Sequence, residues 1–207
     1  MKKRITMLVL VTASLTLAVG VGRATAATTT IDFDSLNGPS FFCVVPASPV
    51  TIGVATFSGG AIMTAVSGLA ADQTTVYGSS PCLGGAPTIT ITFSRPVSDF
   101  SVQLFNGETT TVSYTVADNL GGTSTKSITP FFVSGVETFV HSEVGITSVT
   151  ITTSSSSWDF FIDNVRFTAL PMAAAECKDG GWETFGAFKN QGDCVAWVQT
   201  EGRNAPG

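Results

Sequence analysis

The sequence predicts an all-β protein: an antiparallel β-sandwich over residues 27–169, a linker over 170–176 and a small disulfide-stapled C-terminal helical tail over 177–207. Between Thr28 and Thr168 the chain is rich in Thr, Ser, Val, Ile, Phe and Gly and poor in helix formers. Short runs with β-propensity recur there between Gly, Pro, Asn and Asp, and no helical period separates them. This pattern favours an antiparallel sandwich over alternating strands and helices.

About ten short strands are expected within the sandwich region. Ile89 and Ile91 alternate with threonines, which is typical of a strand with one buried face. Pro96 is expected to end that strand, and the Pro-rich segments 38–49 and 70–87 are expected to be long loops. The predicted strands lie near 29–34, 50–57, 60–66, 88–93, 98–105, 109–117, 123–128, 136–140, 146–153 and 158–167.

The N-terminus has the features of a signal peptide over residues 1–26. Lys2, Lys3 and Arg4 precede the apolar stretch Ile5–Val21, and a small-x-small cleavage pattern ends at Ala26. A single-span membrane anchor is the alternative, which the shortness of the apolar stretch disfavours. We therefore expect a secreted, extracellular protein with no transmembrane segment in the mature chain.

The charge of the mature chain argues against a nucleic-acid partner. The full chain has 10 basic and 15 acidic residues, a formal net charge of −5. Cleavage after Ala26 removes four of the basic residues and none of the acidic ones, so the mature charge becomes −9. Nucleic acids and anionic membranes attract basic surfaces, and the sequence has no basic stripe.

Four cysteines in an exported chain favour two disulfides over a thiolate metal site. Three pairings are formally open. The pairs Cys43–Cys82 and Cys177–Cys194 are favoured because each lies within one segment of like character. The first pair would join the two Pro-rich loops.

The tail is expected to contain one short helix. Asn190 and Asp193 have the spacing of a helix-start box, and Gly202 is a suitable stop. A unit of this size buries little apolar surface, so the disulfide would have to hold it together.

The last strand of the sandwich carries an acidic residue where its apolar face should continue. Strict alternation along 158–167 would place Asp163 on that face, which is costly for a charge. A one-residue bulge at Asp163–Asn164 removes the conflict and turns Asp163 toward a neighbouring segment. The bulge aligns five apolar residues on one face: Trp158, Phe160, Ile162, Val165 and Phe167.

Asp163 has two interpretations. It could accept hydrogen bonds from adjacent backbone amides, which is the simpler and favoured one. Alternatively, it could join Asp32 or Asp34 of the first strand around a structural calcium ion, because carboxylate oxygens suit that cation.

The sequence contains no recognisable catalytic motif, so we expect a non-enzyme. It has no nucleophile elbow, zinc-protease helix or phosphate-binding loop. His141, the one histidine of the chain, is expected to face solvent on a strand rather than to act as a base. A hydrolase built on paired carboxylates needs no histidine and stays open as a minor alternative.

The aromatic residues of the loops are the candidate ligand contacts. Phe41, Phe42 and Tyr77 are expected to plug the core beneath the loops, with an exposed sugar-stacking platform as the alternative. If a ligand is stacked, Tyr77 or Trp158 would be the contact.

Three stretches, 31–34, 91–100 and 161–167, together resemble secreted bacterial jelly-roll modules of the carbohydrate-binding and discoidin-like type. The resemblance implies a jelly-roll-like sandwich and, in carbohydrate-binding relatives, a calcium site that would map to Asp32, Asp34 and Asp163. The resemblance identifies no sugar-binding residue in this chain, because the loops have no matching motif. The segment from Cys177 to Asn204 is similar to short two-cysteine tails on exported actinobacterial proteins, which imply no activity.

Three functions follow from these observations, in decreasing order of support. The first is a secreted non-catalytic module that binds glycan or a cell-envelope polymer. The second is a structural or adhesive extracellular protein with a protein partner. The third is a small glycan-active hydrolase or lyase.

Overall fold

The computed structural model of the chain describes residues 28–40, 43–44, 46–64, 75–83, 87–204 and 206. The predicted signal peptide and the loop residues Phe41 and Phe42 lie outside the described residues. Within the described ranges, no helix is both long enough and apolar enough to cross a membrane.

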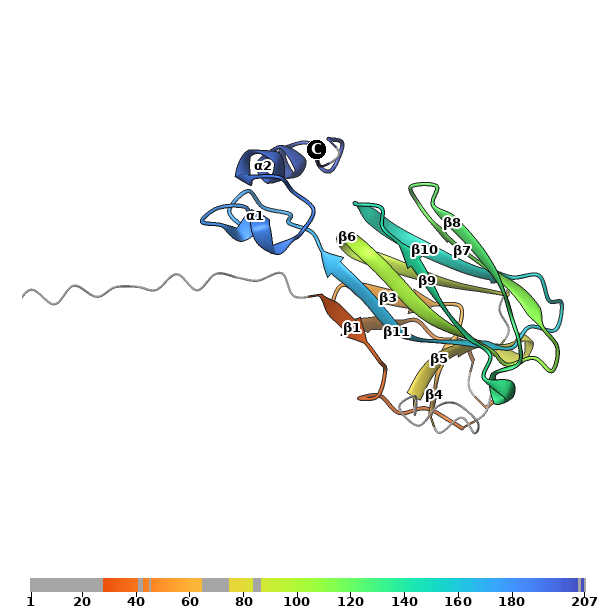
Figure 1. Ribbon diagram of the computed structural model, residues 1–207. Coiled ribbons are helices and arrows are strands. Elements are labelled where there is room, and N and C mark those ends of the chain that lie inside the picture. Colours follow the sequence, from red (N-terminus) through yellow and green to blue (C-terminus); the bar gives the residue numbers. More distant parts are fainter. Residues whose placement is uncertain are drawn as a thin grey trace, which may run out of the picture.

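Antiparallel strands dominate the described chain, which confirms the all-β prediction (Figure 1). Two short 3₁₀ segments, η1 (Pro81–Leu83) and η2 (Phe131–Val133), lie between strands, and the helices α1 (Gly181–Thr184) and α2 (Gln191–Gln199) form the tail. The strands are β1 (Thr29–Ile31), β2 (Val50–Ile52), β3 (Ala55–Ser58), β4 (Ala61–Thr64), β5 (Thr75–Ser79), β6 (Thr88–Asn106), β7 (Val112–Asp118), β8 (Thr123–Ile128), β9 (Val136–His141), β10 (Ile146–Thr153) and β11 (Phe160–Ala169).

The long strand β6 belongs to both layers of the sandwich. Its first half pairs with β3 and β10, and its second half pairs with β9 and β11. One layer therefore runs β2-β3-β6-β10-β7-β8, and the other runs β4-β5-β11-β6-β9 with β1 beside the end of β11. The main core lies between them and includes Ile91 and Val149 from the first layer and Leu104 and Val165 from the second.

The prediction that Pro96 ends a strand is wrong. β6 continues through Pro96, which lies where the strand leaves one layer and enters the other. The next residue, Val97, pairs with Ile146 of the first layer and with Ala169 of the second. Proline has no N–H to donate to a ladder, so it is tolerated at this corner between two sheets.

Strand β5 lies in a segment that we expected to be a loop. All five of its residues are buried, and it pairs with β4 on one side and β11 on the other. A short strand that is buried on both faces has no alternation of apolar and polar residues, and here it contains Gly78 and is closely followed by Pro81. Its pairing with β11 is a long-range contact that local patterns do not reveal.

The predicted bulge in β11 is confirmed. Asp163 pairs with Gln103 and Arg166 pairs with Ser101, so β11 has one more residue than β6 over this interval. The extra residue is Asn164, whose φ of 48° lies in the left-handed region that Asn tolerates. As expected, the bulge aligns one apolar face: Phe160, Ile162, Val165 and Phe167 are buried in the main core, and Trp158 packs against it.

A second bulge, on β6, was not predicted. Ser101 pairs with Arg166 and Ser98 pairs with Thr168, so here β6 has the extra residue. Asp99 has a φ of 52° at this point, again in the left-handed region. The pair Arg166–Ser101 therefore lies between two bulges of opposite strands.

Both favoured disulfides are present, Cys43–Cys82 and Cys177–Cys194. In the tail, the Asn190 side chain accepts a hydrogen bond from the Asp193 amide at 2.9 Å, which confirms the predicted helix start. The Gly202 amide donates to the carbonyl of Trp197, as expected for the helix stop. The four-residue helix α1 is additional to the one helix predicted.

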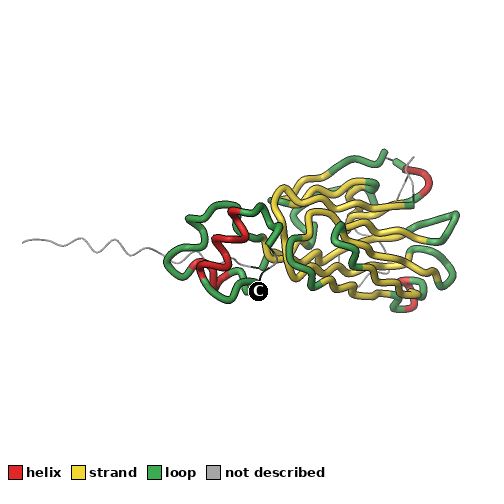
Figure 2. Tube along the Cα trace, turned by 90° about the horizontal axis from the view of Figure 1, so that it is seen from above, coloured by secondary structure: helices red, strands yellow, loops and turns green. Residues whose placement is uncertain are grey.

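The tail packs on one end of the sandwich (Figures 1 and 2). The guanidinium of Arg95, on β6, donates to the carbonyl of Leu170 and forms an ion pair with Glu176 at 2.7 Å. The ring of Trp197 lies against Gly145, where a Cβ atom would come within 2.8 Å of it. Polar and apolar contacts together hold the tail against the β6 corner.

We expect Arg95→Met to lower the free energy of unfolding by about 2 kcal/mol, because it leaves the carbonyl of the buried Leu170 and the carboxylate of Glu176 without their charged donor. Urea denaturation measures the change. Arg203→Met is the control, since the Arg203 guanidinium donates within the tail, to Thr200. Equal effects of the two substitutions would contradict the role of Arg95.

At the β11 bulge, we expect Asn164→Val to destabilise the protein by about 2 kcal/mol, because a β-branched residue tolerates a positive φ poorly. Both Asn164→Val and Asn164→Gly remove the hydrogen bonds that the Asn164 side-chain amide donates to Gln103 and Asp163. The glycine variant lacks the backbone strain, so it should cost less. Thermal unfolding of both variants separates the two contributions. A glycine variant as unstable as the valine variant would show that the strain is unimportant.

Candidate functional site

A groove of about 420 Å³ crosses the outer face of the second layer. Its centre is a row of paired residues on adjacent strands: Arg166 on β11, Ser101 on β6 and Val140 on β9. The residues lining the groove are Thr28, Asp99, Ser101, Val140, Ser142 and Arg166.

The alternation of the strands turns these side chains outward. Val165 and Phe167 are buried on either side of Arg166, and Phe100 and Val102 are buried on either side of Ser101. Side chains at successive strand positions point to opposite faces, so the residues between buried ones face solvent. The two bulges determine which residues face outward, because each one shifts the alternation of the side chains by one residue.

The chemistry of the groove is polar with one apolar side chain. The lining offers one guanidinium, one carboxylate and the hydroxyls of three residues, and Val140 is 65% exposed among them. Ser98 donates a hydrogen bond to the Asp99 carboxylate at 3.1 Å. Among the described residues, none forms a hydrogen bond or ion pair with the Arg166 guanidinium, which leaves its five donors for a ligand.

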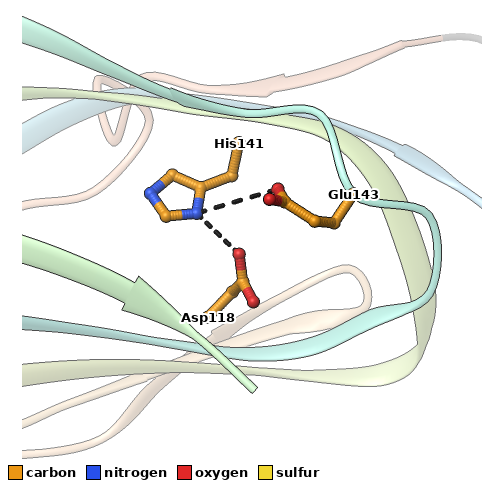
Figure 3. A group of neighbouring side chains, drawn as sticks. All are labelled: Asp118, His141 and Glu143. Carbon is orange, nitrogen blue, oxygen red and sulfur yellow. Dashed lines mark hydrogen bonds and ion pairs between the residues drawn. The ribbon is translucent and has the colours of Figure 1, made fainter. Parts of the chain in front are cut away.

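His141 faces inward from the end of the same strand, so the prediction that it faces solvent is wrong (Figure 3). Phe139 and His141 share one face of β9, whereas Val140 and Ser142 face the groove. The signal was present in the sequence, because Phe139 is two residues before His141. Alternation from that phenylalanine places His141 inside the sandwich.

His141 is held by side chains from two other strands. Its Nδ1 is 2.6 Å from the Asp118 carboxylate at the end of β7, and its Nε2 is 3.1 Å from the hydroxyl of Ser124 on β8. The β8 and β9 strands are outer strands of opposite layers. His141 therefore links the two layers at the open side of the sandwich.

The Asp118 carboxylate is fully engaged. Its Oδ1 accepts hydrogen bonds from the amides of Leu120 and Gly122, and its Oδ2 faces His141. Burial acts to raise the pKa of Asp118, but the hydrogen bonds from His141 and the two amides outweigh burial and lower that pKa. Asp118 is thus held as an anion beside the imidazole.

Glu143 completes the cluster from the turn between β9 and β10. Its Oε2 is 3.9 Å from His141 Nδ1 (Figure 3), and within the described residues this enclosed oxygen has no hydrogen-bond partner. No local motif in the sequence singled out Glu143. It reaches the cluster only because the β9–β10 turn lies beside the β7–β8 loop.

Tyr77 is a core residue, which confirms the favoured interpretation, and its alternative as a ligand contact is wrong. Tyr77 is completely buried, and its hydroxyl accepts from the Gly60 amide at 3.0 Å and donates to the Ser48 carbonyl at 3.3 Å. Its ring packs with Phe33 and Phe57. No face of this ring is accessible to a sugar.

Trp158 is half-buried at the far end of β11 from Arg166. It packs against the main core, and its enclosed indole Nε1 has no hydrogen-bond partner among the described residues. A ligand contact at Trp158 stays a prediction. It would form a site separate from the groove.

The proposed calcium site at Asp32, Asp34 and Asp163 is not assembled. Among the described residues, the carboxylate and histidine groups close enough to share an ion are those of Asp118, His141 and Glu143. Asp32 and Asp34 are exposed, and Asp34 accepts from the Thr75 amide. The buried Asp163 accepts from the Asn164 amide at 2.7 Å, as its favoured interpretation predicted. The Asp163 carboxylate thus accepts a hydrogen bond from the backbone of the bulge itself.

Asp159, next to Trp158, has a strongly shifted pKa. Burial, and then the negative charge of Glu108, raise its pKa from 3.8 to about 7. Its Oδ1 is enclosed without a hydrogen-bond partner among the described residues. The ionised carboxylate is therefore costly in the folded state.

We expect Asp159→Asn to stabilise the protein at pH 8 by roughly 2 kcal/mol, after allowing for partial exposure, and to change little at pH 4. The folded pKa lies above the unfolded one, so the wild type loses stability as pH rises toward and through 7. Thermal unfolding at both pH values measures this. The exposed Glu183→Gln is the control, and an equal gain at pH 4 would contradict the charge as the cause.

No protein-family model matches the chain, and no curated protein matches it. Among solved structures, the K2 cleaved adhesin domain of Lys-gingipain matches with a TM-score of 0.40 at 15% identity, over 69% of this chain and 98% of that chain. The CBM51-2 and INT domains of Clostridium perfringens ZmpB match with a TM-score of 0.39 at 10% identity, over 72% of this chain and 34% of that chain.

An exo-β-1,3-galactanase from Phanerochaete chrysosporium matches at a TM-score of 0.35 and 19% identity, over 58% of this chain and 29% of that chain. The match with this enzyme, like that with the ZmpB domains, thus spans well under two thirds of the other chain. Similarities of this extent carry no argument about function, which rests on the residues of the chain itself.

Proposed function

We propose that the protein is a secreted, non-catalytic module that binds a glycan or cell-envelope polymer in the groove over β11, β6 and β9. The observation that carries the proposal is the row of outward side chains centred on Arg166, Ser101 and Val140. Two disulfides support an extracellular location, because such bonds persist in oxidising compartments.

The lining suits the hydroxyl groups and the C–H faces of sugars. A guanidinium and a carboxylate, from Arg166 and Asp99, can each hold two adjacent sugar hydroxyls through paired hydrogen bonds. The exposed side chain of Val140 gives an apolar contact for a pyranose face. The groove is open and crosses several strands, which fits an extended chain better than a small enclosed ligand.

The groove also supports a binding role over a catalytic one. Hydrolysis of a glycosidic bond by the usual mechanism needs two carboxyl groups facing one another across the bond. The described lining contains a single carboxylate, that of Asp99.

A protein partner is the second candidate function, and one surface favours it. Phe132, Val133 and Val136, between 41% and 59% exposed, lie together in sequence at η2 and the start of β9. Exposed apolar side chains that gather in one place are common where proteins associate. This surface is distinct from the residues that line the groove.

Affinity electrophoresis of the mature chain through a panel of soluble polysaccharides, with pull-down on insoluble ones, tests the proposal. For a polysaccharide that retards the wild type, we expect Arg166→Ala and Asp99→Ala each to weaken binding at least about tenfold, a loss typical of a charge-assisted hydrogen bond. Arg203→Ala, in the tail, is the matched control and should bind as the wild type does.

The variants also separate the competing sites. Loss of binding in Trp158→Phe with full binding in Arg166→Ala would move the site to the other end of β11. Failure of every polysaccharide to retard the wild type would overturn the glycan proposal. Self-association that Phe132→Ser abolishes would then favour the protein-partner function.

A further inference from the structure

We propose that Asp118, His141 and Glu143 form a binding site for a divalent transition-metal ion, with Zn²⁺ the best fit. One oxygen or nitrogen from each residue lies within 4.8 Å of the others. The residues come from the end of β7, the end of β9 and the β9–β10 turn (Figure 3). The site is inside the sandwich, on the opposite side of β9 from the groove, and does not depend on the glycan proposal.

The donor set selects the metal. One imidazole nitrogen with two carboxylate oxygens suits Zn²⁺, which binds nitrogen and oxygen ligands in tetrahedral sites. Calcium prefers six or more oxygens, and His141 cannot supply one. In a tetrahedral zinc site, neighbouring ligand atoms are about 3.3 Å apart. The separations here, 2.6 Å from Nδ1 to Asp118 and 3.9 Å from Nδ1 to Glu143, lie on either side of that value.

The atoms around the three ligands already orient them. The Oδ1 atom of Asp118 is held by the amides of Leu120 and Gly122, so Oδ2 is the oxygen turned to the site. The other nitrogen of His141, Nε2, is bonded to the Ser124 hydroxyl. Histidine ligands of metals nearly always have such a second hydrogen bond, which fixes the plane of the ring.

The Ser124 hydroxyl can serve both protonation patterns of the ring. With a proton on Nδ1, the hydroxyl donates to Nε2. With a metal on Nδ1, that proton is released to solvent and Nε2–H donates to the hydroxyl instead. A water molecule can supply the fourth ligand, because the Glu143 side chain is 39% exposed and connects the site to solvent.

Two further observations indicate a site for a cation. The Oε2 atom of Glu143 is enclosed with no hydrogen-bond partner among the described residues, which is costly for a carboxylate. Gly122 borders the cluster, and a Cβ atom at that position would be 2.1 Å from Asp118 Oδ2 and 2.7 Å from Glu143 Oε1. A side chain there would displace both carboxylates, so glycine keeps the space between them.

The test uses tag-free mature protein, treated with a chelator and then dialysed. Calorimetric titration with ZnCl₂ should give one site per chain, and the thermal midpoint should rise with zinc concentration. CaCl₂ should produce neither effect. His141 is the one histidine of the chain, so its ring C–H resonances are unambiguous in an NMR spectrum and should shift on addition of zinc.

Glu143→Gln should weaken zinc binding at least about tenfold and leave the fold intact, because the side chain is partly exposed. Glu137→Gln is a matched control on β9 with a similarly exposed carboxylate, 42% against 39%. It should bind zinc as the wild type does. Gly122→Ala should also weaken binding, by filling the space between the carboxylates.

Absence of both heat and a midpoint shift in the wild type would overturn the proposal and leave the cluster as a purely structural link between the layers. Zinc binding that survives unchanged in Glu143→Gln, or that leaves the His141 resonances unmoved, would overturn it equally, because the ion would then lie elsewhere. All of these results are independent of any glycan measurement.

Discussion

The rest of the structure depends on the phase of the side-chain alternation along β6, β9 and β11, that is, on which residues face the core and which face solvent. One face of these strands fills the core and the other faces solvent, so a shift of one residue would exchange the two. The bulges at Asp99 and Asn164 set the phase, one on each strand of the β6–β11 pair. They lie on either side of the Arg166–Ser101 pair and so determine which side chains line the groove.

The same phase produces both candidate sites. On β9, Val140 faces the groove, while His141 points into the sandwich and meets Asp118 and Ser124. A buried imidazole between strands of opposite layers is stable only when its polar atoms are satisfied, and here both nitrogens are. The polar cluster thus closes the open side of the sandwich, where no backbone pairing joins β8 to β9 in the described structure.

The tail depends on the corner in β6. Pro96 accepts a hydrogen bond from the Leu170 amide through its carbonyl, and the adjacent Arg95 binds the carbonyl of Leu170. A disulfide closes the tail on itself, and Trp197 fits against a glycine of the β9–β10 turn. That turn also carries Glu143, so the docked tail and the His141 cluster share one connection of the sandwich.

The sequence by itself determined the all-β class, the start of the tail helix and the bulge at Asp163–Asn164, and it favoured the two disulfide pairs that form. These features follow from local composition, alternation and chemistry, which a single chain displays directly. Alternation counted from Phe139 also places His141 inside the sandwich, although the prediction had it facing solvent. Tertiary structure alone decided the pairing of β5, the passage of β6 through Pro96 and the burial of Tyr77. It alone also brought Asp118, His141 and Glu143 together, because their proximity arises from strands that meet across two layers, and no local pattern encodes such a contact.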